Sequence, residues 1–218
     1  MNKRVANILA DKRFYELGVT ISMGRFIPVY WNPKRPLSHP EILSVVSEEF
    51  VELIKKIKPR IEVVAGGETG GISLAAATAL KAGLPWVYIR KKSKGYSTDV
   101  LVEGDYRRGA RAILLDDVIA NGASKKIFLD NVRGKLVIKD IAVILDDTGG
   151  RYPTWMKRQG VYIHSLMRKD ERDKYYHQSG FFNDDMYEVA QAYHRDRDNW
   201  ANNKVLYKKF LKLKQKGF

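Results

Sequence analysis

Two adjacent aspartates near the middle of the chain have residue types and spacing that could do chemistry. Asp116 and Asp117 follow an apolar run and precede the residues VIANGAS. Two neighbouring carboxylates at a strand end are costly to bury unless they bind something, and they can accept hydrogen bonds from the two hydroxyls of a ribose. The glycine and the helix start that follow favour an anion, and Asn121 and Ser124 add side-chain donors. The segment Ala112–Ser124 therefore indicates a site for a ribose 5-phosphate.

This pair of aspartates is a weak signal when it is taken alone. Neighbouring residues of a strand point to opposite faces, so one of the two could be a structural partner in an ion pair. The joint pattern is more specific, because an apolar strand, two acids, two apolar residues and a turn of small residues occur in succession.

Two further segments carry residues suited to a phosphate-rich ligand. Gly66–Gly71, with the sequence GGETGG, follows the apolar run IEVVA. Arg90, Lys91 and Lys94 stand at and after the end of the run PWVYIR and would supply positive charge. Taken singly, the first segment could be a simple turn between a strand and a helix, and the second a solvated basic loop. The strand before the basic segment and the aspartate motif after it favour the functional interpretation of that segment, and a simple turn stays an alternative for GGETGG.

The period of the apolar residues changes along the chain and predicts an alternation of strands and helices. Strands that are nearly continuous in apolar residues and alternate with helices indicate an α/β fold, with an open, mainly parallel sheet covered by helices on both faces. Ligands of such sheets bind beyond the carboxyl ends of the strands. The predicted helices cover residues 40–58, 72–81, 124–133 and 153–159, and the predicted strands cover residues 61–65, 85–90, 111–116, 138–145 and 161–166.

The two ends of the chain do not show this alternation. Residues 1–37 are predicted to be irregular after a short amphipathic start, and Ser38 is the expected N-cap of the first long helix. Residues 169–218 are polar and then basic, with six lysines and no acidic residue from Asn203 onward. We favour a terminal helix that docks on the body or on a partner subunit, and we keep open a basic arm that contacts nucleic acid. The predicted apolar stripe of this helix comprises Val205, Leu206, Phe210, Leu211 and Leu213.

The composition narrows the class of protein. The chain has 218 residues, a formal net charge of +14 and no cysteine. The positive charge favours polyanions or a phosphate-rich substrate, and the lack of cysteine excludes thiol nucleophiles, disulfides and cysteine-based zinc sites. No stretch approaches about 18 apolar residues and the N-terminus has no long apolar run, so we expect a soluble, cytoplasmic protein with no membrane span and no secretory signal.

Together these motifs resemble the signature with which type I phosphoribosyltransferases bind 5-phosphoribosyl 1-diphosphate (PRPP). The likeness runs from about Gly18 to Arg168 and is to the orotate phosphoribosyltransferase branch in particular. GVTISMGRFIPVYWNPKRPLSHPEIL resembles the family's N-terminal segment, AGGETGGISLAAATAL its pyrophosphate loop, YIRKKSKGYSTDVLVEG its mobile catalytic loop and VYIHSL its closing strand.

The resemblance implies an architecture and an activity. A phosphoribosyltransferase domain would occupy residues 1–168, with residues 1–37 as a hood, and residues 169–218 would form a basic, helical extension. The family transfers 5-phosphoribose from PRPP to a nitrogenous base, in this branch orotate, and releases pyrophosphate. It uses Mg²⁺ to help bind the pyrophosphate and works as a homodimer, in which the mobile loop reaches into the neighbour's site.

The resemblance also implies roles for individual residues. The ribose hydroxyls would be held by Asp116 and Asp117, and the 5-phosphate by Asn121, Gly122, Ala123 and Ser124. The pyrophosphate would be bound by Glu68, Thr69 and Gly70. The catalytic residues would be Arg90, Lys91, Lys94 and Asp117, because cations placed on a departing pyrophosphate stabilise its developing charge.

Three features depart from the family pattern. The phosphate turn reads Ala120-Asn121-Gly122-Ala123 where the family commonly has Thr-Thr-Gly-Gly, and Asn121 can still donate. Tyr96 stands where the mobile loop usually has a histidine, and a tyrosine titrates near ~10, so it is a poorer proton donor near neutrality. Asp147 stands where orotate enzymes place an arginine that pairs with the carboxylate of orotate, and a second carboxylate there is repulsive. Asp147 and the nearby Arg151 are the predicted base-binding residues. The reaction class is therefore better supported than the identity of the base.

A different class of function stays open. A protein of this fold could keep the PRPP site as a sensor without catalysis and bind nucleic acid, which the net charge of +14, the basic end and Tyr96 favour. The enzyme is the preferred hypothesis, because both acids, the pyrophosphate loop and the loop cations are retained. A third role, in subunit assembly through the C-terminal helix, is compatible with the first.

Overall fold

The computed structural model describes residues 1–21, 24–93 and 100–217. Its internal contacts divide the chain into two compact units. The larger unit, which we call the sheet unit, is continuous and comprises residues 37–166. The smaller unit, which we call the terminal unit, joins residues 1–36 to residues 167–218.

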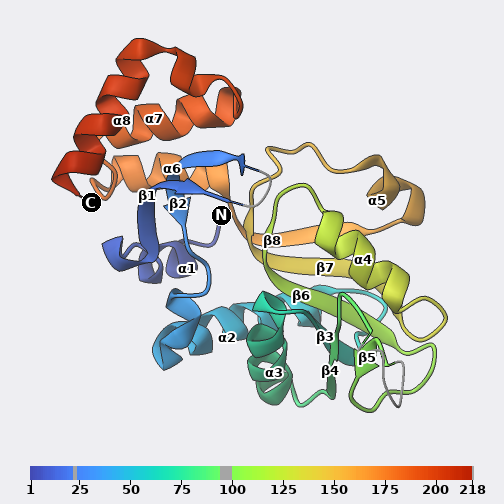
Figure 1. Ribbon diagram of the computed structural model, residues 1–218. Coiled ribbons are helices and arrows are strands. Elements are labelled where there is room, and N and C mark those ends of the chain that lie inside the picture. Colours follow the sequence, from blue (N-terminus) through green and yellow to red (C-terminus); the bar gives the residue numbers. More distant parts are fainter. Residues whose placement is uncertain (22–23, 94–99, 218) are drawn as a thin grey trace. The chain divides into compact units, whose positions relative to one another are not determined.

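The sheet unit is built on a sheet of six described strands in the order β5-β4-β3-β6-β7-β8 (Figure 1). Strand β3 pairs in parallel with both β4 and β6, and β6 pairs in parallel with β7. Among these described strands, the short β5 pairs with β4 in the antiparallel direction. The predicted open, mainly parallel sheet is confirmed. Its strands are β3 (Val63–Gly67), β4 (Trp86–Ile89), β5 (Val102–Glu103), β6 (Arg111–Ile119), β7 (Val137–Asp146) and β8 (Tyr162–Arg168).

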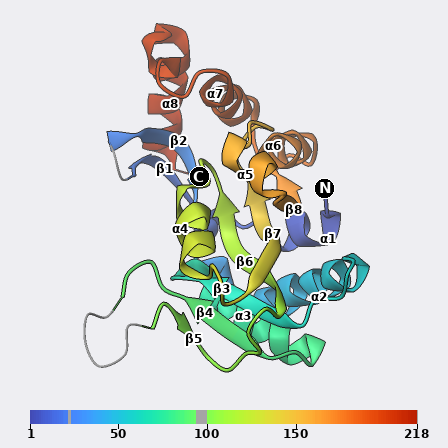
Figure 2. The same ribbon diagram turned by 90° about the vertical axis from the view of Figure 1, so that its right-hand side faces the viewer.

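Helices cover both faces of this sheet, as predicted (Figures 1 and 2). Helices α2 (Pro40–Lys56) and α3 (Gly70–Ala82) lie on one face, and α4 (Ala123–Asn131) and α5 (Thr154–Gln159) on the other. Because side chains alternate along a strand, each apolar strand supplies both layers of core. On the α4 face, fully buried Ala65 and Leu114 pack with Phe128 of α4 and Met156 of α5.

The register of the parallel strands brings the loops of interest to one edge. Gly66 of β3 lies opposite Leu115 of β6, and Ile119 of β6 lies opposite Asp146 of β7. Strands β6 and β7 therefore end side by side, and β3 ends one residue beyond Gly66 toward the same edge of the sheet. This arrangement is the edge at which a parallel sheet binds its ligands.

The prediction of irregular structure for residues 1–37 is wrong. This segment forms α1 (Lys3–Ile8) and an antiparallel hairpin of β1 (Tyr15–Thr20) and β2 (Phe26–Trp31). Pro28 argues against a strand in the sequence, but a two-stranded hairpin leaves an outer edge at which a missing N–H costs nothing. The predicted cap at Ser38 is also wrong, because α2 begins after His39 with Pro40 in its first turn.

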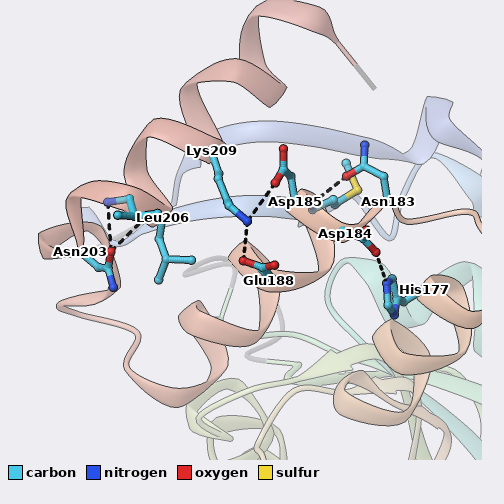
Figure 3. A network of polar contacts seen from close by, with 10 residues as sticks. His177, Asn183, Asp184, Asp185, Glu188, Asn203, Leu206 and Lys209 are labelled. Atoms are coloured by element: carbon cyan, nitrogen blue, oxygen red, sulfur yellow. Dashed lines mark hydrogen bonds and ion pairs between the residues drawn. The ribbon is translucent and has the colours of Figure 1, made fainter.

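The C-terminal residues are helical, as predicted, and consist of α6 (Lys169–Gln178), α7 (Asp184–Arg195) and α8 (Lys204–Lys216). The last two are held together by Lys209, whose Nζ lies 3.1 Å from Asp185 Oδ1 and 2.7 Å from Glu188 Oε2 (Figure 3). The side chain of Asn203 accepts the N–H groups at the start of α8 (Figure 3). These contacts support the interpretation of a docked helix.

The predicted apolar stripe of α8 is only partly correct. Phe210 and Leu213 are buried, whereas Val205 is 66% exposed and Leu211 40% exposed. The division into residues 1–168 and 169–218 stays a prediction, since the C-terminal helices pack in one unit with residues 1–36. In the part of the chain that the structure describes, every helix is too short or too polar to cross a bilayer.

A fully buried ion pair lies at the centre of the terminal unit. Arg172 of α6 is 1% exposed and donates through Nε and Nη2 to Asp173 Oδ1, at 2.9 and 2.6 Å. Asp173 Oδ2 lies 2.8 Å from Nε2 of His194 in α7. Burial raises the pKa of Asp173, but Arg172 and His194 outweigh burial and lower it to about 2. The two helices therefore share one buried carboxylate.

Candidate active site

The glycines of the loop after β3 stand where neighbouring atoms leave no room for a side chain. A Cβ at Gly66 would lie 2.6 Å from the carbonyl oxygen of Gly71, and a Cβ at Gly71 would lie 2.2 Å from the carbonyl oxygen of Leu115. A Cβ at Gly67 would lie 2.4 Å from the ring of Phe128. The glycines thus allow α3 to pack directly on β3 and β6, which fixes the start of α3 at the ligand edge.

Gly70 touches the aspartate motif itself. A Cβ at this position would lie 2.3 Å from Oδ2 of Asp117. The carboxylate of Asp117 therefore lies against the first residue of α3, and its Oδ1 accepts the N–H of Val118 at 2.7 Å. The structure thus brings together two predicted parts of the site that are far apart in the sequence.

Glu68 connects this loop to the basic segment after β4. Its Oε2 accepts the N–H of Lys91 at 2.8 Å, and its own N–H donates to the carbonyl oxygen of Ile89 at 3.0 Å. The following residue, Thr69, is exposed, and the Glu68–Thr69 peptide bond is cis. The backbone N–H and the side-chain carboxylate of Glu68 are thus both hydrogen-bonded to the segment that carries the predicted cations.

The predicted cations are placed unequally. Arg90 Nε donates to Glu103 Oε1 at 2.9 Å and Nη2 donates to the hydroxyl of Tyr88 at 2.9 Å, and the hydrogen bond to Glu103 raises the pKa of Arg90. Lys91 is exposed. Lys94 and Tyr96 lie outside the described residues.

The two aspartates of the motif differ in their surroundings. Asp116 is buried, and its Oδ2 lies 2.6 Å from Nζ of Lys125 in the first turn of α4. Its Oδ1 accepts the N–H of Asp117 at 2.9 Å. Asp117 is half-buried, and burial together with the neighbouring charge of Asp116 raises its pKa to about 6, while Lys125 lowers it. This role of Lys125 was not predicted, because in the sequence it is one of two adjacent lysines near the start of a helix.

The turn between β6 and α4 has the geometry of an anion site. Gly122 has a left-handed backbone (φ 72°), which favours glycine at this position. Asn121 Oδ1 accepts the N–H of Ala123 at 3.1 Å. Asn121 and Ala123 are exposed and Ser124 is half-buried, so the helix N-terminus is open to a ligand.

The loop after β7 completes the edge. Asp146 is 3% exposed and accepts the N–H of Thr148 at 2.8 Å and the hydroxyl of Tyr152. Asp147 donates its N–H to the carbonyl oxygen of Ile119 at 2.8 Å, which places it beside the end of β6. Arg151 is exposed. The pairing of Asp146 with Tyr152 was missed, because a hydrogen bond across a loop has no periodic signal.

Comparisons with known proteins agree with this geometry. No family model matches the chain. An orotate phosphoribosyltransferase of Sinorhizobium medicae is 35% identical over 150 residues, which cover 67% of this chain and 65% of that protein. One from Methanocella arvoryzae is 33% identical over 154 residues, which cover 70% of this chain and 85% of that protein. The aligned region is thus slightly under two thirds of the first relative.

Solved structures show the same fold. The crystal structure of orotate phosphoribosyltransferase from Aeropyrum pernix aligns with a TM-score of 0.69 and 26% identity, over 82% of this chain and 99% of that one. The structure of Leishmania donovani UMP synthase aligns with a TM-score of 0.76 and 20% identity, over 88% of this chain and 42% of that one. With the identity to the Methanocella protein, these findings confirm the predicted family and fold: the chain belongs to the orotate phosphoribosyltransferase family.

Proposed function

We propose that this chain transfers 5-phosphoribose from PRPP to a nitrogenous base and releases pyrophosphate. The observation that carries the proposal is the contact between Asp117 and Gly70. The carboxylate that would bind ribose lies against the N-terminus of α3 at Gly70, and the N-terminus of α4 at Gly122 follows in the same loop. A sugar with a phosphate at one end and a pyrophosphate at the other matches that order of groups.

Each part of PRPP has a proposed partner. The 5-phosphate would bind the turn formed by Asn121, Gly122, Ala123 and Ser124. The ribose hydroxyls would donate to Asp116 and Asp117. The pyrophosphate would bind backbone N–H groups of Glu68, Thr69 and Gly70.

The reaction then needs few protein groups. A ring nitrogen of the base forms a bond to the anomeric carbon, and the bond from that carbon to the pyrophosphate oxygen breaks with its electron pair, with inversion. Arg90, Lys91 and Lys94 are the proposed cations for the departing pyrophosphate, and preorganised charge of this kind is effective in a water-poor site. Glu68 supports the assignment, because it fixes Lys91 to the pyrophosphate loop.

Magnesium is the proposed cofactor, and the residues present fit it. No group of three histidine, cysteine, aspartate or glutamate side chains that could hold a metal occurs among residues 1–21, 24–93 and 100–217. The oxygen atoms of PRPP would therefore be its main ligands, which suits Mg²⁺, a cation that commonly binds substrate phosphates rather than an all-protein cage. When bound, it would neutralise charge on the pyrophosphate.

Orotate is the proposed acceptor, by likeness to the relatives. Asp147 and Arg151 are the proposed base-binding residues, and the backbone of Asp147 lies beside the end of β6. The carboxylate of Asp147 would repel that of orotate unless Arg151 compensates, so a base without a carboxylate is the competing acceptor. A cytoplasmic homodimer is likewise proposed on the family resemblance.

The test is an assay of pyrophosphate release. The full chain is incubated with PRPP and Mg²⁺ and with orotate, uracil, adenine, guanine or hypoxanthine in turn. We expect release with at least one base, and release with orotate alone would establish the acceptor. Absence of release with every base, in protein that is folded by circular dichroism, would refute the proposed reaction.

The pKa of Asp117 near 6 leads to a prediction on pH. The carboxylate accepts from ribose hydroxyls only when ionised, and its raised pKa means that ionisation is lost as the pH falls through about 6. We expect kcat/KM for PRPP to fall roughly tenfold for each pH unit below that value. Because phosphates also titrate near ~6, Asp117→Asn is the control and should keep only the substrate's own dependence. Identical pH profiles of kcat/KM for the unmodified chain and for Asp117→Asn would contradict the proposed role of Asp117.

The second candidate is a protein that binds nucleic acid without catalysis. Lysines at 204, 208, 212, 214 and 216 of α8 are exposed. The docking of α8 through Phe210, Leu213 and Lys209 favours a structural role for the helix instead. Salt-dependent binding of RNA, together with no pyrophosphate release, would reverse this order.

A further inference from the structure

The peptide unit that joins Arg90 to Lys91 is held by side chains from two other parts of the sheet unit. Its N–H, on Lys91, donates to Glu68 Oε2 at 2.8 Å. Its carbonyl oxygen, on Arg90, accepts the side-chain amide of Asn131 at 2.6 Å, and the same amide also donates to the carbonyl oxygen of Lys91 at 3.4 Å. Both polar groups of one peptide unit beyond the end of β4 are therefore bonded to side chains.

Asn131 is the last residue of the helix that starts at the candidate phosphate turn. Helix α4 runs from Ala123 to Asn131, so its first residue belongs to that turn and its last residue meets the segment that carries the proposed cations. Between these two points the helix is anchored by Phe128, which is fully buried in the core on this face of the sheet. Asn131 itself is half-buried. One helix thus links the phosphate turn to the cationic segment.

The two proposed cations of this segment depend on the peptide unit to different degrees. Arg90 has further contacts, because its N–H donates to the carbonyl oxygen of Leu101 at 2.9 Å and its guanidinium donates to Glu103 and Tyr88. Lys91 is exposed, and the direction in which its side chain leaves the backbone follows from the orientation of the preceding peptide unit. A peptide unit is planar, so bonds to its N–H on one side and to its carbonyl oxygen on the other fix that orientation.

We propose that Asn131 is a positioning residue for the transfer reaction, which together with Glu68 fixes the backbone of Lys91 and so sets where the Lys91 ammonium stands relative to the departing pyrophosphate. The inference rests on the proposed function and adds to it a residue that touches no part of PRPP. The contribution of Asn131 is geometric, and a misplacement of about 1 Å at a reacting group can lower a rate by about 100-fold.

The experiment measures pyrophosphate release in a single turnover, with the full chain in excess over PRPP, in the presence of Mg²⁺ and of orotate or the base of the panel that supports release. Asn131→Leu removes the donor and keeps a branched side chain of similar shape. Lys91→Met removes the ammonium, and the double variant Asn131→Leu, Lys91→Met completes a double-mutant cycle. Calorimetry gives the Kd for PRPP, and thermal unfolding reports which variants fold.

The neighbouring residue of the same helix provides the matched control. Asp130 is exposed, and its carboxylate pairs with Lys126 at 2.7 Å and with Arg133 at 2.9 Å on the surface of the protein. Asp130→Ala therefore removes polar contacts at the end of α4 without removing a bond to residues 90 and 91. This variant should match the unmodified chain in single-turnover rate and in Kd for PRPP.

We expect Asn131→Leu to lower the single-turnover rate roughly 10- to 100-fold and to change the Kd for PRPP by less than about threefold, because the loss falls on the transition state. Lys91→Met should lower the rate by roughly 100-fold, as the loss of a group that stabilises developing charge implies. The double variant should be slower than Lys91→Met by no more than about twofold, since Asn131 then has no ammonium to position.

Two results would overturn the inference. One is an Asn131→Leu variant that folds and releases pyrophosphate as fast as the unmodified chain. The other is a double variant in which the two rate losses multiply, because independent losses would show that Asn131 does not act through Lys91. If Asn131→Leu does not fold, Asn131→Ala takes its place in the same comparisons, since alanine is compatible with a helix end. An unmodified chain that releases no pyrophosphate refutes the proposed function itself, and the role of Asn131 falls with it.

Discussion

Gly70→Ala is expected to weaken the use of PRPP strongly while the chain stays folded. The new Cβ would lie 2.3 Å from Oδ2 of Asp117, so the carboxylate must leave the position from which it would meet the ribose. Alanine is a better helix former than glycine, so the start of α3 itself is not weakened. We expect kcat/KM for PRPP to fall by roughly 100-fold, the loss that follows when charge-assisted hydrogen bonds are removed.

The neighbouring residue provides the matched control. In Gly71→Ala the same methyl group would meet the backbone carbonyl oxygen of Leu115 at 2.2 Å, and a strand backbone cannot move aside as a side chain can. This variant should lose stability in thermal unfolding, whereas Gly70→Ala should melt near the unmodified chain. Gly70→Ala with unchanged PRPP kinetics would contradict the place of Asp117 in the site.

Arg172→Met is expected to have the largest effect on stability. It removes the guanidinium from the fully buried pair and leaves Asp173 charged in the interior, a change that typically costs about 3–5 kcal/mol. The free energy of unfolding in urea measures this loss. The double variant Arg172→Met, Asp173→Asn should recover a large part of it, because no uncompensated carboxylate remains.

The same pair sets a response to acid. The pKa of Asp173 is lowered from 3.8 to about 2, so the stability that it contributes is complete above about pH 4 and is lost as the pH falls towards 2. In the double variant this acid-dependent part should be absent. An equal loss of stability in acid for both proteins would show that Asp173 is not responsible.

The sequence was most informative where burial is continuous. IEVVA and AILLDD are apolar on both sides, which occurs when helices cover both faces of a strand, and β3 and β6 follow. It failed at the hairpin, where the strand that contains Pro28 has no clean alternation and depends on its partner. The sequence also has no apolar stripe that would mark the bounds of α6, because this helix buries Arg172 and Asp173.

The candidate site was predictable to a similar extent. Three parts of the site are local sequence patterns, and each lies at the predicted carboxyl edge of the sheet. They are the aspartate motif, the glycine-rich residues 66–71 and the turn between β6 and α4. The pairing of Asp116 with Lys125 was not predictable, because it depends on where the first turn of α4 places Lys125 relative to the end of β6. The need for glycine at 70 and 71 depends on atoms more than 40 residues away in the chain, which no local pattern records.

The side chain of Asn121 occupies an N–H group in the turn between β6 and α4 that a phosphate could otherwise bind. Since its side-chain oxygen accepts the N–H of Ala123, a phosphate at the proposed site would replace that oxygen rather than add a new bond. Hydrogen bonds to a charged acceptor are roughly twice as strong as neutral ones, so a phosphate gains from the exchange while a neutral acceptor such as water gains little. With the proposed ligand, the turn would keep its shape when empty and still favour a charged group, at the expense of part of the affinity that an uncapped N–H would give.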